Sequence, residues 1–361
     1  MMKFGLMMKD ISGAERTAIT SLVTFLKQVP IIDNVDVSEE GIRNGREIDG
    51  ILYVSSWKKT YELICEFKSN GQPKNIRSAI HQLKAYMYDR DGEATPVVLA
   101  PYLSPESRQL CAEQNVAFLD EQGNASFRFG GIYISHQVPS IPAAEKRGLR
   151  SVFSPKSAQV LRMMLNERQR AWRVTELAEK GNISLGHASN VRKKLLEREW
   201  AVSNDDGLLL SKPDALLDEW KREYRSLAGK RIKYYTPLHG KLLEERLRVL
   251  LGCDDDKGYA VLASFSAAQW LSPYGRTGMH YFYADEKGLS RLIDGLGLTT
   301  AAKGENVIVT MPGDRGIFQD AIEPAPGIYT TGVVQTYLDL SSQGERGQES
   351  ADHLRNEWMD W

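Results

Sequence analysis

The sequence lacks the features that mark several common classes of protein. It holds 3 cysteines in 361 residues, far apart, which excludes a disulfide framework and a cysteine zinc site. Its 6 histidines are scattered, without HxxxH or HExxH spacing, and no Walker A string occurs. No run of 18 apolar residues and no signal peptide is evident, so we expect a cytoplasmic protein that has no membrane partner.

Charge is nearly balanced overall but unevenly distributed. The formal net charge is −1. Residues 1–149 carry 17 Lys and Arg against 18 Asp and Glu, residues 150–250 carry 21 against 13, and residues 251–361 carry 8 against 16. The middle third, with its net charge of +8, indicates contact with a polyanion, most often nucleic acid. The acidic final third is not expected to touch DNA.

Two breaks in composition divide the chain. One is the proline-containing stretch Val138–Arg150, and the other is the acidic turn Gly252–Gly258. The predicted parts are residues 1–138, a linker at 139–153, residues 154–250 and residues 251–361. Helical and strand patterns alternate in the first part, helices dominate the second, and the third is mixed. The predicted fold class is therefore a multidomain α/β plus α+β protein.

Local patterns predict the individual elements. In the first part we predict helices at 15–29, 75–88 and 104–115, and strands at 48–54, 61–68, 96–100, 116–120 and 126–129. In the second we predict helices at 155–165, 174–180, 185–199 and 213–227, and a hairpin of strands 201–203 and 208–210. In the third we predict strands at 259–262, 279–284 and 306–309, and helices at 266–271, 286–296, 333–341 and 345–358.

The first part contains two carboxylates and a lysine on neighbouring predicted strands. Asp49 lies on the first strand, and Glu66 and Lys68 end the second. Residues two apart in a strand point to the same face, so Glu66 and Lys68 project together and a neighbouring strand can bring Asp49 beside them. Carboxylate oxygens suit Mg²⁺, and Glu15 could add a third ligand. Glu47 is an alternative to Asp49, and Glu-x-Lys by itself also occurs on any exposed strand end.

The following helix adds Gln82 and Tyr86, four residues apart on one face. Taken in order with Glu15, Asp49 and Glu66-x-Lys68, this pattern resembles the PD-(D/E)xK nuclease superfamily over roughly residues 10–100. The resemblance implies a restriction-endonuclease-like α/β/α domain. It also implies that Asp49, Glu66 and Lys68 handle metal and water, with Glu15 as a possible further metal ligand and with Gln82 and Tyr86 as accessory residues. Such domains either cleave DNA or serve as inert DNA-handling scaffolds.

The second part contains a helix-turn-helix pattern between Val174 and Leu196. Gly181 can end the first helix in the left-handed region, and Ser184 can cap the second. Ala188, Val191 and Leu195 follow the spacing of a core face. The hairpin that comes next would be the wing. We therefore predict a winged helix-turn-helix domain in the middle of the chain.

The other face of the second helix is rich in hydrogen-bond donors that suit bases and phosphates in a major groove. The candidate DNA-binding residues are Arg173, Ser184, His187, Ser189, Asn190, Arg192, Lys193 and Lys194. The alternative is a solvated face, balanced by Glu197 and Glu199, or a surface for protein contacts. The positive charge of the segment favours double-stranded DNA.

Longer stretches resemble the AbiEi family of antitoxin-type transcriptional regulators. The similar stretches are Pro96–Ile134, Ser151–Leu165, Trp172–Trp200, Phe265–Pro273, Asn306–Phe318 and Val333–Leu354. The resemblance implies a C-terminal α/β antitoxin domain and a repressor of its own promoter. It also implies a type IV toxin–antitoxin context, with a nucleotidyltransferase-like toxin that is neutralised without stable contact.

Three functions follow from these patterns. The first is a sequence-specific DNA-binding regulator, expected as a homodimer because winged-helix regulators usually bind two half-sites. The second is a Mg²⁺-dependent endonuclease targeted by the winged helix. The third is a protein-interaction module that neutralises a toxin directly, in which case a stable complex would form without DNA.

Overall fold

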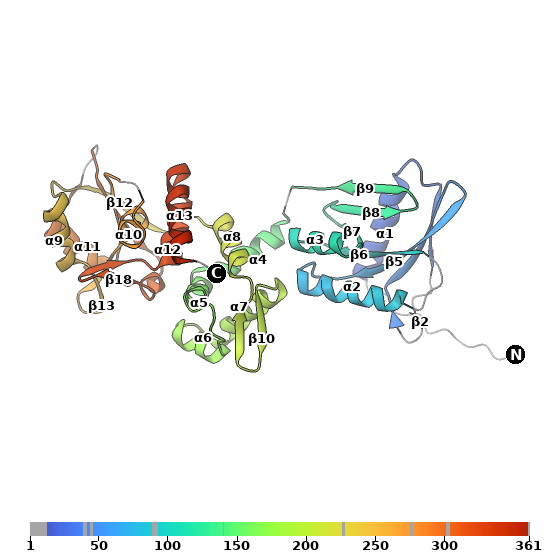
Figure 1. The fold of residues 1–361 in the computed structure, drawn as a ribbon, viewed down its shortest axis with the longest axis horizontal. Coiled ribbons are helices and arrows are strands. Elements are labelled where there is room, and N and C mark those ends of the chain that lie inside the picture. The colour runs from blue at the N-terminus through green and yellow to red at the C-terminus, as the bar shows by residue number, and fades with distance from the viewer. Residues whose placement is uncertain are drawn as a thin grey trace. The chain divides into compact units, whose positions relative to one another are not determined.

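The computed structural model describes residues 13–38, 42–43, 46–88, 93–139, 141–225, 228–274, 277–300 and 304–359. The chain forms two compact units. The first comprises residues 1–146 together with 196–199, and the second comprises residues 147–195 and 200–361. Both contain helices and sheets, so the protein is a mixed α/β multidomain protein, as predicted (Figure 1).

The N-terminal unit is built on a seven-stranded sheet in the order β1-β4-β5-β6-β7-β8-β9. Its strands are β1 (Asn34–Ser38), β4 (Gly50–Ser56), β5 (Lys59–Phe67), β6 (Ala94–Ala100), β7 (Ala117–Asp120), β8 (Ala125–Phe129) and β9 (Ile132–His136). Strands β5, β6 and β7 run parallel, and the outer pairs are antiparallel. A separate short pair, β2 (Ile42–Arg43) and β3 (Arg46–Glu47), precedes β4.

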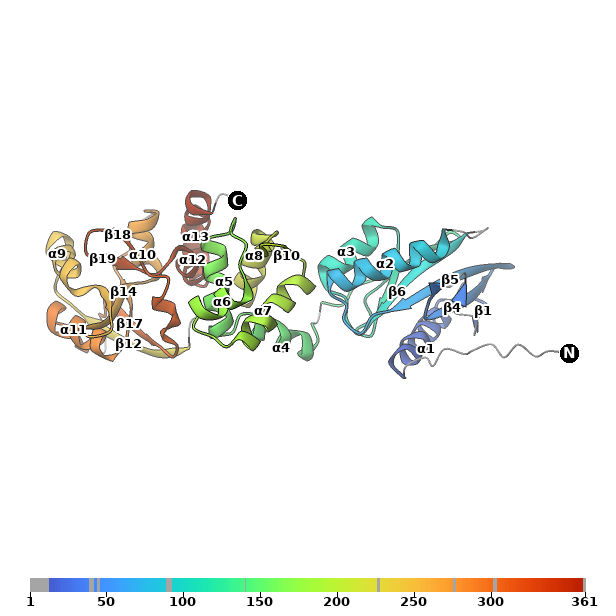
Figure 2. The same cartoon turned by 90° about the horizontal axis from the view of Figure 1, so that it is seen from below.

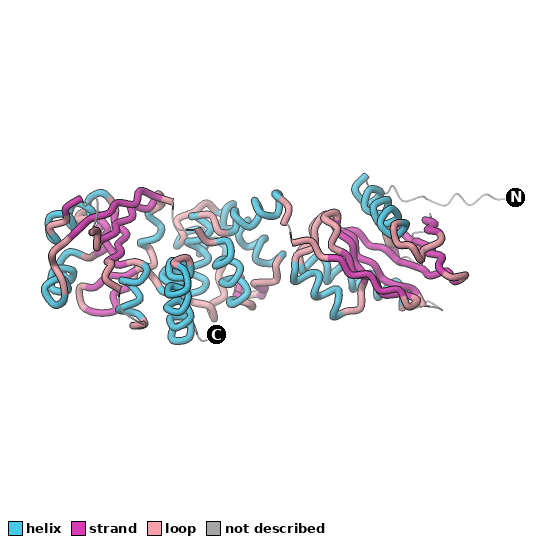
Figure 3. Tube along the Cα trace, turned by 90° about the horizontal axis from the view of Figure 1, so that it is seen from above, coloured by secondary structure: helices cyan, strands magenta, loops and turns pink. Residues whose placement is uncertain are grey.

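Helices cover both faces of this sheet. Helix α1 (Gly13–Lys27) packs on one face, and α2 (Pro73–Met87) and α3 (Pro105–Glu113) pack on the other, as Figures 2 and 3 show from two sides. Each face of the sheet has its own hydrophobic core, and successive strand residues contribute to opposite faces. Leu63 and Cys65 pack in the core with α1, and Ile64 packs in the core with α2. This alternation follows from the period of two in a strand.

The predicted elements of this unit are present, with shifts of a few residues at their ends. Helix α3 begins after Ser104, whose hydroxyl accepts a hydrogen bond from the Ser107 amide. Two differences stand out. Strands β1 and β9 were not predicted, and residues within the predicted linker form helix α4 (Ala143–Val152). Only Leu149 and Val152 of that helix are buried, so its apolar pattern is weak.

The second unit begins with a helical segment. Its elements are α5 (Pro155–Asn166), α6 (Val174–Lys180), α7 (Leu185–Glu197), the hairpin β10 (Ala201–Asn204) and β11 (Gly207–Leu210), and α8 (Pro213–Glu223). The hairpin is antiparallel, with Asn204 paired to Gly207. The predicted helices and hairpin are therefore present, and α8 ends several residues earlier than expected.

A mixed eight-stranded sheet follows, in the order β16-β12-β17-β15-β14-β19-β18, with β13 paired to β14. Its strands are β12 (Gly229–Tyr235), β13 (Gly252–Asp254), β14 (Gly258–Leu262), β15 (His280–Ala284), β16 (Thr299–Thr300), β17 (Val307–Pro312), β18 (Ile322–Ala325) and β19 (Ile328–Thr330). Strand β12 precedes residue 251, so the sheet begins inside the segment that we predicted as helical. Its exposed residues Lys230, Arg231 and Lys233 interrupt the alternation of apolar and polar residues by which a strand is recognised.

The remaining helices pack around this sheet. They are α9 (Gly240–Leu250), α10 (Ser264–Leu271), α11 (Glu286–Leu296), α12 (Val333–Ser341) and α13 (Gly344–Trp358), with a short 3-10 helix η1 (Arg315–Phe318). Leu247 of α9 and Leu292 of α11 share a core with Phe282, and η1 contributes to a smaller core that contains Val261 and Tyr283. No helix within the described residues is long and apolar enough to cross a membrane.

Candidate functional site

Two of the predicted carboxylates, Asp49 and Glu66, lie on neighbouring segments of the N-terminal unit, at the start of β4 and the end of β5. Asp49 lies one residue before β4, and its amide donates to the Cys65 carbonyl at 3.1 Å. The Phe67 amide donates to Asp49 Oδ2 at 2.8 Å. This bond places the Asp49 carboxylate beside the chain segment that carries Glu66 and Lys68. Both carboxylates are buried, at 7% exposed for Asp49 and 3% for Glu66.

Lys68 completes this group. Its ammonium donates to Glu66 Oε1 at 2.6 Å and to Gln82 Oε1 at 3.4 Å. The Lys68 side chain is 25% exposed, so the group reaches the surface at this point. The pKa of the Cys65 thiol is raised by burial and, in addition, by the nearby negative charges of Asp49 and Glu66. We call Asp49, Glu66, Lys68 and Gln82 the acidic cluster.

Two further predicted residues, Tyr86 and Glu15, lie on the helices that pack on either face of the sheet. Tyr86 is one turn after Gln82 on α2 and is buried in the same core as Ile48. Glu15 lies in the first turn of α1. Ile19, one turn later, packs so closely on Gly50 that a Cβ there would lie 2.8 Å from its Cδ1. Helix α1 therefore passes next to the end of β4 that follows Asp49.

A metal site requires several ligand side chains that lie close together. Among the residues that the structure describes, no three His, Cys, Asp or Glu side chains are grouped so that they could hold a metal ion. Glu15 is thus not brought into one group with Asp49 and Glu66. Two carboxylates still fit Mg²⁺, which is commonly held by one or two carboxylates, with water and substrate phosphates as the other ligands. The side chain of Glu47, the alternative to Asp49, lies outside the described residues.

The second candidate site is the outer face of α7. Ala188, Val191 and Leu195 are buried, as predicted. The Ser184 hydroxyl accepts a hydrogen bond from the His187 amide at 3.2 Å and caps the helix. The exposed residues are three or four positions apart, so they lie in one stripe along one side of the helix, opposite the buried residues. The residues of this stripe are Leu185, Gly186, Ser189, Asn190 and Lys193.

The other predicted DNA-binding residues lie on the flanks of α7. His187 is hydrogen bonded through Nε2 to the Ser157 hydroxyl at 3.0 Å, and Lys194 donates to the Ser151 hydroxyl at 2.7 Å. Both side chains therefore turn toward α4 and α5. On the opposite flank, Arg192 donates to Ser203 of the hairpin at 3.2 Å. These contacts hold α7 against its neighbours.

The start of α6 carries Arg173. Its amide donates to the Glu176 carboxylate at 2.9 Å, which closes the first turn and helps to lower the pKa of Glu176. The Arg173 side chain is exposed. Leu185, 54% exposed at the start of α7, was not among the predicted residues. Leu185 is one helical turn before Ser189 and so lies on the same face of α7, which could have marked it as a candidate.

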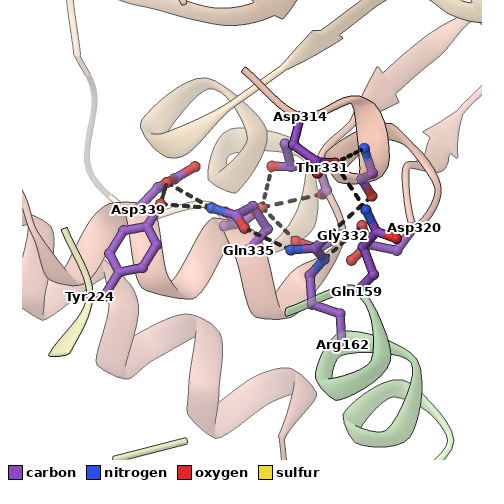
Figure 4. Close-up of polar contacts among 11 residues, drawn as sticks. Gln159, Arg162, Tyr224, Asp314, Asp320, Thr331, Gly332, Gln335 and Asp339 are labelled. Carbon is purple, nitrogen blue, oxygen red and sulfur yellow. Dashed lines mark hydrogen bonds and ion pairs between the residues drawn. The ribbon is translucent and has the colours of Figure 1, made fainter. Parts of the chain in front are cut away.

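A third polar group, which we call the buried network, was not predicted at all. Arg162 of α5 donates to Asp320 at 3.1 Å, to the Gly316 carbonyl at 3.0 Å and to Gln335 of α12 at 3.4 Å (Figure 4). Gln159, one turn earlier on α5, donates to Asp314 at 2.9 Å. The network therefore joins α5 to η1, the loop after it and α12.

The other end of the buried network is Asp339. Its carboxylate accepts hydrogen bonds from Tyr224 at 2.5 Å, from Tyr283 at 3.0 Å and from Gln335 at 3.0 Å. Burial raises the pKa of Asp339 to about 6, although these hydrogen bonds act in the opposite direction. The pKa of Tyr224 is raised well above its usual value by burial and by the negative charge of Asp339.

Comparisons with known proteins give no further guide to the chain. No family model, no curated protein and no solved structure matches it. The resemblances to PD-(D/E)xK nucleases and to AbiEi regulators therefore stay predictions from the sequence.

Proposed function

We propose that the protein is a sequence-specific DNA-binding regulator that reads double-stranded DNA with α7. Helices α5, α6 and α7 followed by the hairpin β10–β11 have the order of elements of a winged helix-turn-helix domain, in which the second helix of the motif enters the major groove. The observation that carries the proposal is the exposed stripe of α7. Asn190 can donate to and accept from an adenine edge, and Lys193 can reach a guanine edge or a phosphate.

The flanking contacts support this assignment. Arg192 links α7 to the hairpin, and Lys194 and His187 link it to α4 and α5. A recognition helix held on both flanks presents its outer face in one orientation, which reduces the entropy lost on binding. Leu185 adds an apolar contact of the kind that thymine methyl groups accept.

The regulatory role rests on the AbiEi resemblance. We propose repression of the protein's own promoter, in a toxin–antitoxin, defence or mobile-element context. A homodimer would bind two half-sites. A toxin of the nucleotidyltransferase type would be neutralised without a stable complex. Co-purification of the toxin in the absence of DNA would contradict this part and favour direct neutralisation.

The test is selection of binding sites from a random duplex library, followed by footprinting of the upstream region. We expect one preferred sequence. Asn190→Ala should weaken binding to it by about 1–3 kcal/mol, with relaxed specificity at one position. Asn166→Ala, an exposed asparagine at the end of α5, is the matched control and should bind as the wild type does. Selection without enrichment would reject sequence-specific binding.

A second candidate function is metal-dependent DNA cleavage by the acidic cluster. It is favoured by the bonds that join Asp49 to the Phe67 amide and Lys68 to Glu66. Asp49 and Glu66 would hold Mg²⁺, which supplies Lewis-acid activation of a phosphate or water. The Lys68 ammonium would orient the attacking water or stabilise charge on the phosphate, and Gln82 would fix the position of that ammonium.

Calorimetry with Mg²⁺ or Mn²⁺, run beside plasmid cleavage, tests this candidate. Asp49→Ala should abolish both metal binding and cleavage, and Lys68→Ala should abolish cleavage. Asp36→Ala removes an exposed carboxylate of the same sheet and should change neither. Equal cleavage by wild type and Asp49→Ala would identify a contaminating nuclease and reject the candidate.

A further inference from the structure

A cavity of about 220 Å³ lies inside the second unit, beside the buried network. Its lining comes from two parts of that unit. The lining includes Phe153, Ala158 of α5 and Trp220 of α8 from the helical part, and Ile317 of η1 and Gln335 of α12 from the part that holds the eight-stranded sheet. Ligand sites in proteins occur preferentially between such structural modules, with mostly apolar walls and a few polar groups.

One wall of the cavity is a stack of aromatic rings. The rings of Phe153 and Trp220 lie 5.5 Å apart at 10°, and the other neighbour of Phe153 is Trp200, at 6.2 Å and 25°. Phe153 and Trp220, together with Tyr224, give the cavity three aromatic side chains in its lining, against which a ligand ring can pack. The wall therefore favours a flat aromatic molecule over a branched aliphatic one.

The charged residues that line the cavity balance one another. They are two arginines, Arg162 and Arg225, and two acids, Glu223 and Asp314. Arg162 is bonded to Asp320 just outside the lining, and Asp314 accepts from Gln159 and from the Gly316 amide. Arg225 donates to the backbone carbonyls of Arg222 and Tyr224. The two positive and two negative charges of the lining cancel, so a charged ligand gains no net attraction to offset its desolvation cost.

The wall of the cavity also adjoins α7 and its hairpin. Trp200, stacked on Phe153, lies between these elements. Its amide donates to Leu195 of α7 at 3.0 Å, and its carbonyl accepts from the Ser211 amide, just after β11, at 2.9 Å. A ring bound against Phe153 is therefore one side chain away from Trp200, the residue that connects the proposed recognition helix to the proposed wing.

We propose that this cavity binds an uncharged planar aromatic molecule of one or two rings, and that its occupancy changes the affinity of the protein for DNA. The binding site stands on the geometry of the cavity alone, and only the coupling rests on the proposed DNA-binding function. The coupling is reciprocal, so DNA would change the affinity for the aromatic molecule by the same factor.

Three probes that differ in charge test the site: indole, benzoate and benzylamine. Each is titrated into the full chain and followed by ligand-observed NMR and calorimetry. We expect indole to bind at least tenfold more tightly than either charged probe. Tighter binding of benzoate or benzylamine, or no binding of indole, would overturn the proposal.

Two substitutions locate the binding. Ala158→Phe fills the cavity from α5, and Ala228→Phe narrows it at an exposed position, where the fold tolerates a larger side chain more readily. Both should weaken indole binding at least tenfold. Ala144→Phe, at an exposed alanine of α4 that does not line the cavity, is the control and should bind indole normally. Unchanged binding in both cavity variants would place indole elsewhere and overturn the site.

DNA binding is measured separately, so that the two proposals can fail independently. Saturating indole should change the affinity for a selected duplex at least fivefold in the wild type and not in Ala228→Phe. Indole binding without any effect on DNA affinity would overturn the coupling. A chain that binds indole but selects no duplex would reject the DNA-binding function and leave the aromatic site in place.

Discussion

In the acidic cluster of the N-terminal unit, the cation is Lys68, a quarter of whose side chain is exposed. In the buried network of the second unit, the cation is Arg162, whose side chain is 4% exposed and which is bonded to Asp320 and two other acceptors. Both groups pair buried acids with a cation. The first opens toward solvent, where a substrate could reach it, and the second is closed and joins structural elements.

This difference predicts that removing the acid will cost more stability in the buried network than in the acidic cluster. Asp320→Ala should lower the free energy of unfolding by about 3–5 kcal/mol, because it leaves the Arg162 guanidinium buried without its counterion. Urea unfolding measures the change. Arg162→Met with Asp320→Leu, which removes both charges, should recover most of the loss.

The matched change in the acidic cluster is Glu66→Ala. Lys68 can then reach water, so the loss should be only about 1 kcal/mol. Equal losses for Asp320→Ala and Glu66→Ala would remove the distinction between an open and a closed cluster.

The pH dependence of stability should separate the two groups further. The pKa of Asp339 is about 6 in the folded protein and near 3.8 when unfolded, so the folded state holds the proton more tightly. Its stabilising contribution is complete below pH 3.8 and is lost as the pH rises through 6. From pH 4 to 7 the wild type should lose about 2 kcal/mol through this group. In Asp339→Asn that loss should be absent, as urea unfolding across this pH range would reveal; equal pH slopes would contradict the assignment.

Substitutions in the exposed stripe of α7 should change DNA binding and leave the stability of the protein unchanged. Lys193→Ala should reduce the salt dependence of DNA binding, lowering the slope of log K against log salt by about 0.9 if the lysine contacts one phosphate. Fluorescence anisotropy over a salt series measures this slope. Lys241→Ala, an exposed lysine of α9, should leave it unchanged. A slope that responds equally to both variants would indicate a general charge effect.

The smallest expected change is at the cap of α7. Ser184→Ala removes the hydroxyl that accepts from the His187 amide and should destabilise the protein by about 1 kcal/mol. Ser184→Asp, which keeps a capping oxygen, should be close to the wild type. A loss of DNA affinity in Ser184→Ala without loss of stability would instead place the serine in contact with DNA.

Local signals in the sequence predicted much of the fold and little of the buried network. Helix α11 was predicted with both ends correct, and in the structure Asp285 caps its start and Gly297 ends it in the left-handed region. Glu66 and Lys68 were predicted to lie together because they are two residues apart in a strand. Arg162 and Asp320 are 158 residues apart, and no periodicity links positions at that separation.

The boundaries of the parts were harder to predict for a related reason. Strand β12 carries three exposed basic residues, so its two inward side chains, Ile232 and Tyr234, give too short an alternation to recognise. Helix α4 lies after Pro142 in a stretch of small and charged residues that resembles a linker. In β12, burial of these two side chains against distant elements, and not a local pattern, determines the strand. In α4 only Leu149 and Val152 are buried, so no apolar pattern marks the helix.

The separation of 158 residues between Arg162 and Asp320 also has a consequence during synthesis. At roughly 5–20 residues per second, Arg162 is synthesised about 8–30 seconds before its acidic partner. During that time the face of α5 that bears Gln159 and Arg162 has no C-terminal half to cover it. The nascent chain therefore passes through a stage in which the helix-turn-helix segment can fold while this face of α5 is exposed to water or to a chaperone.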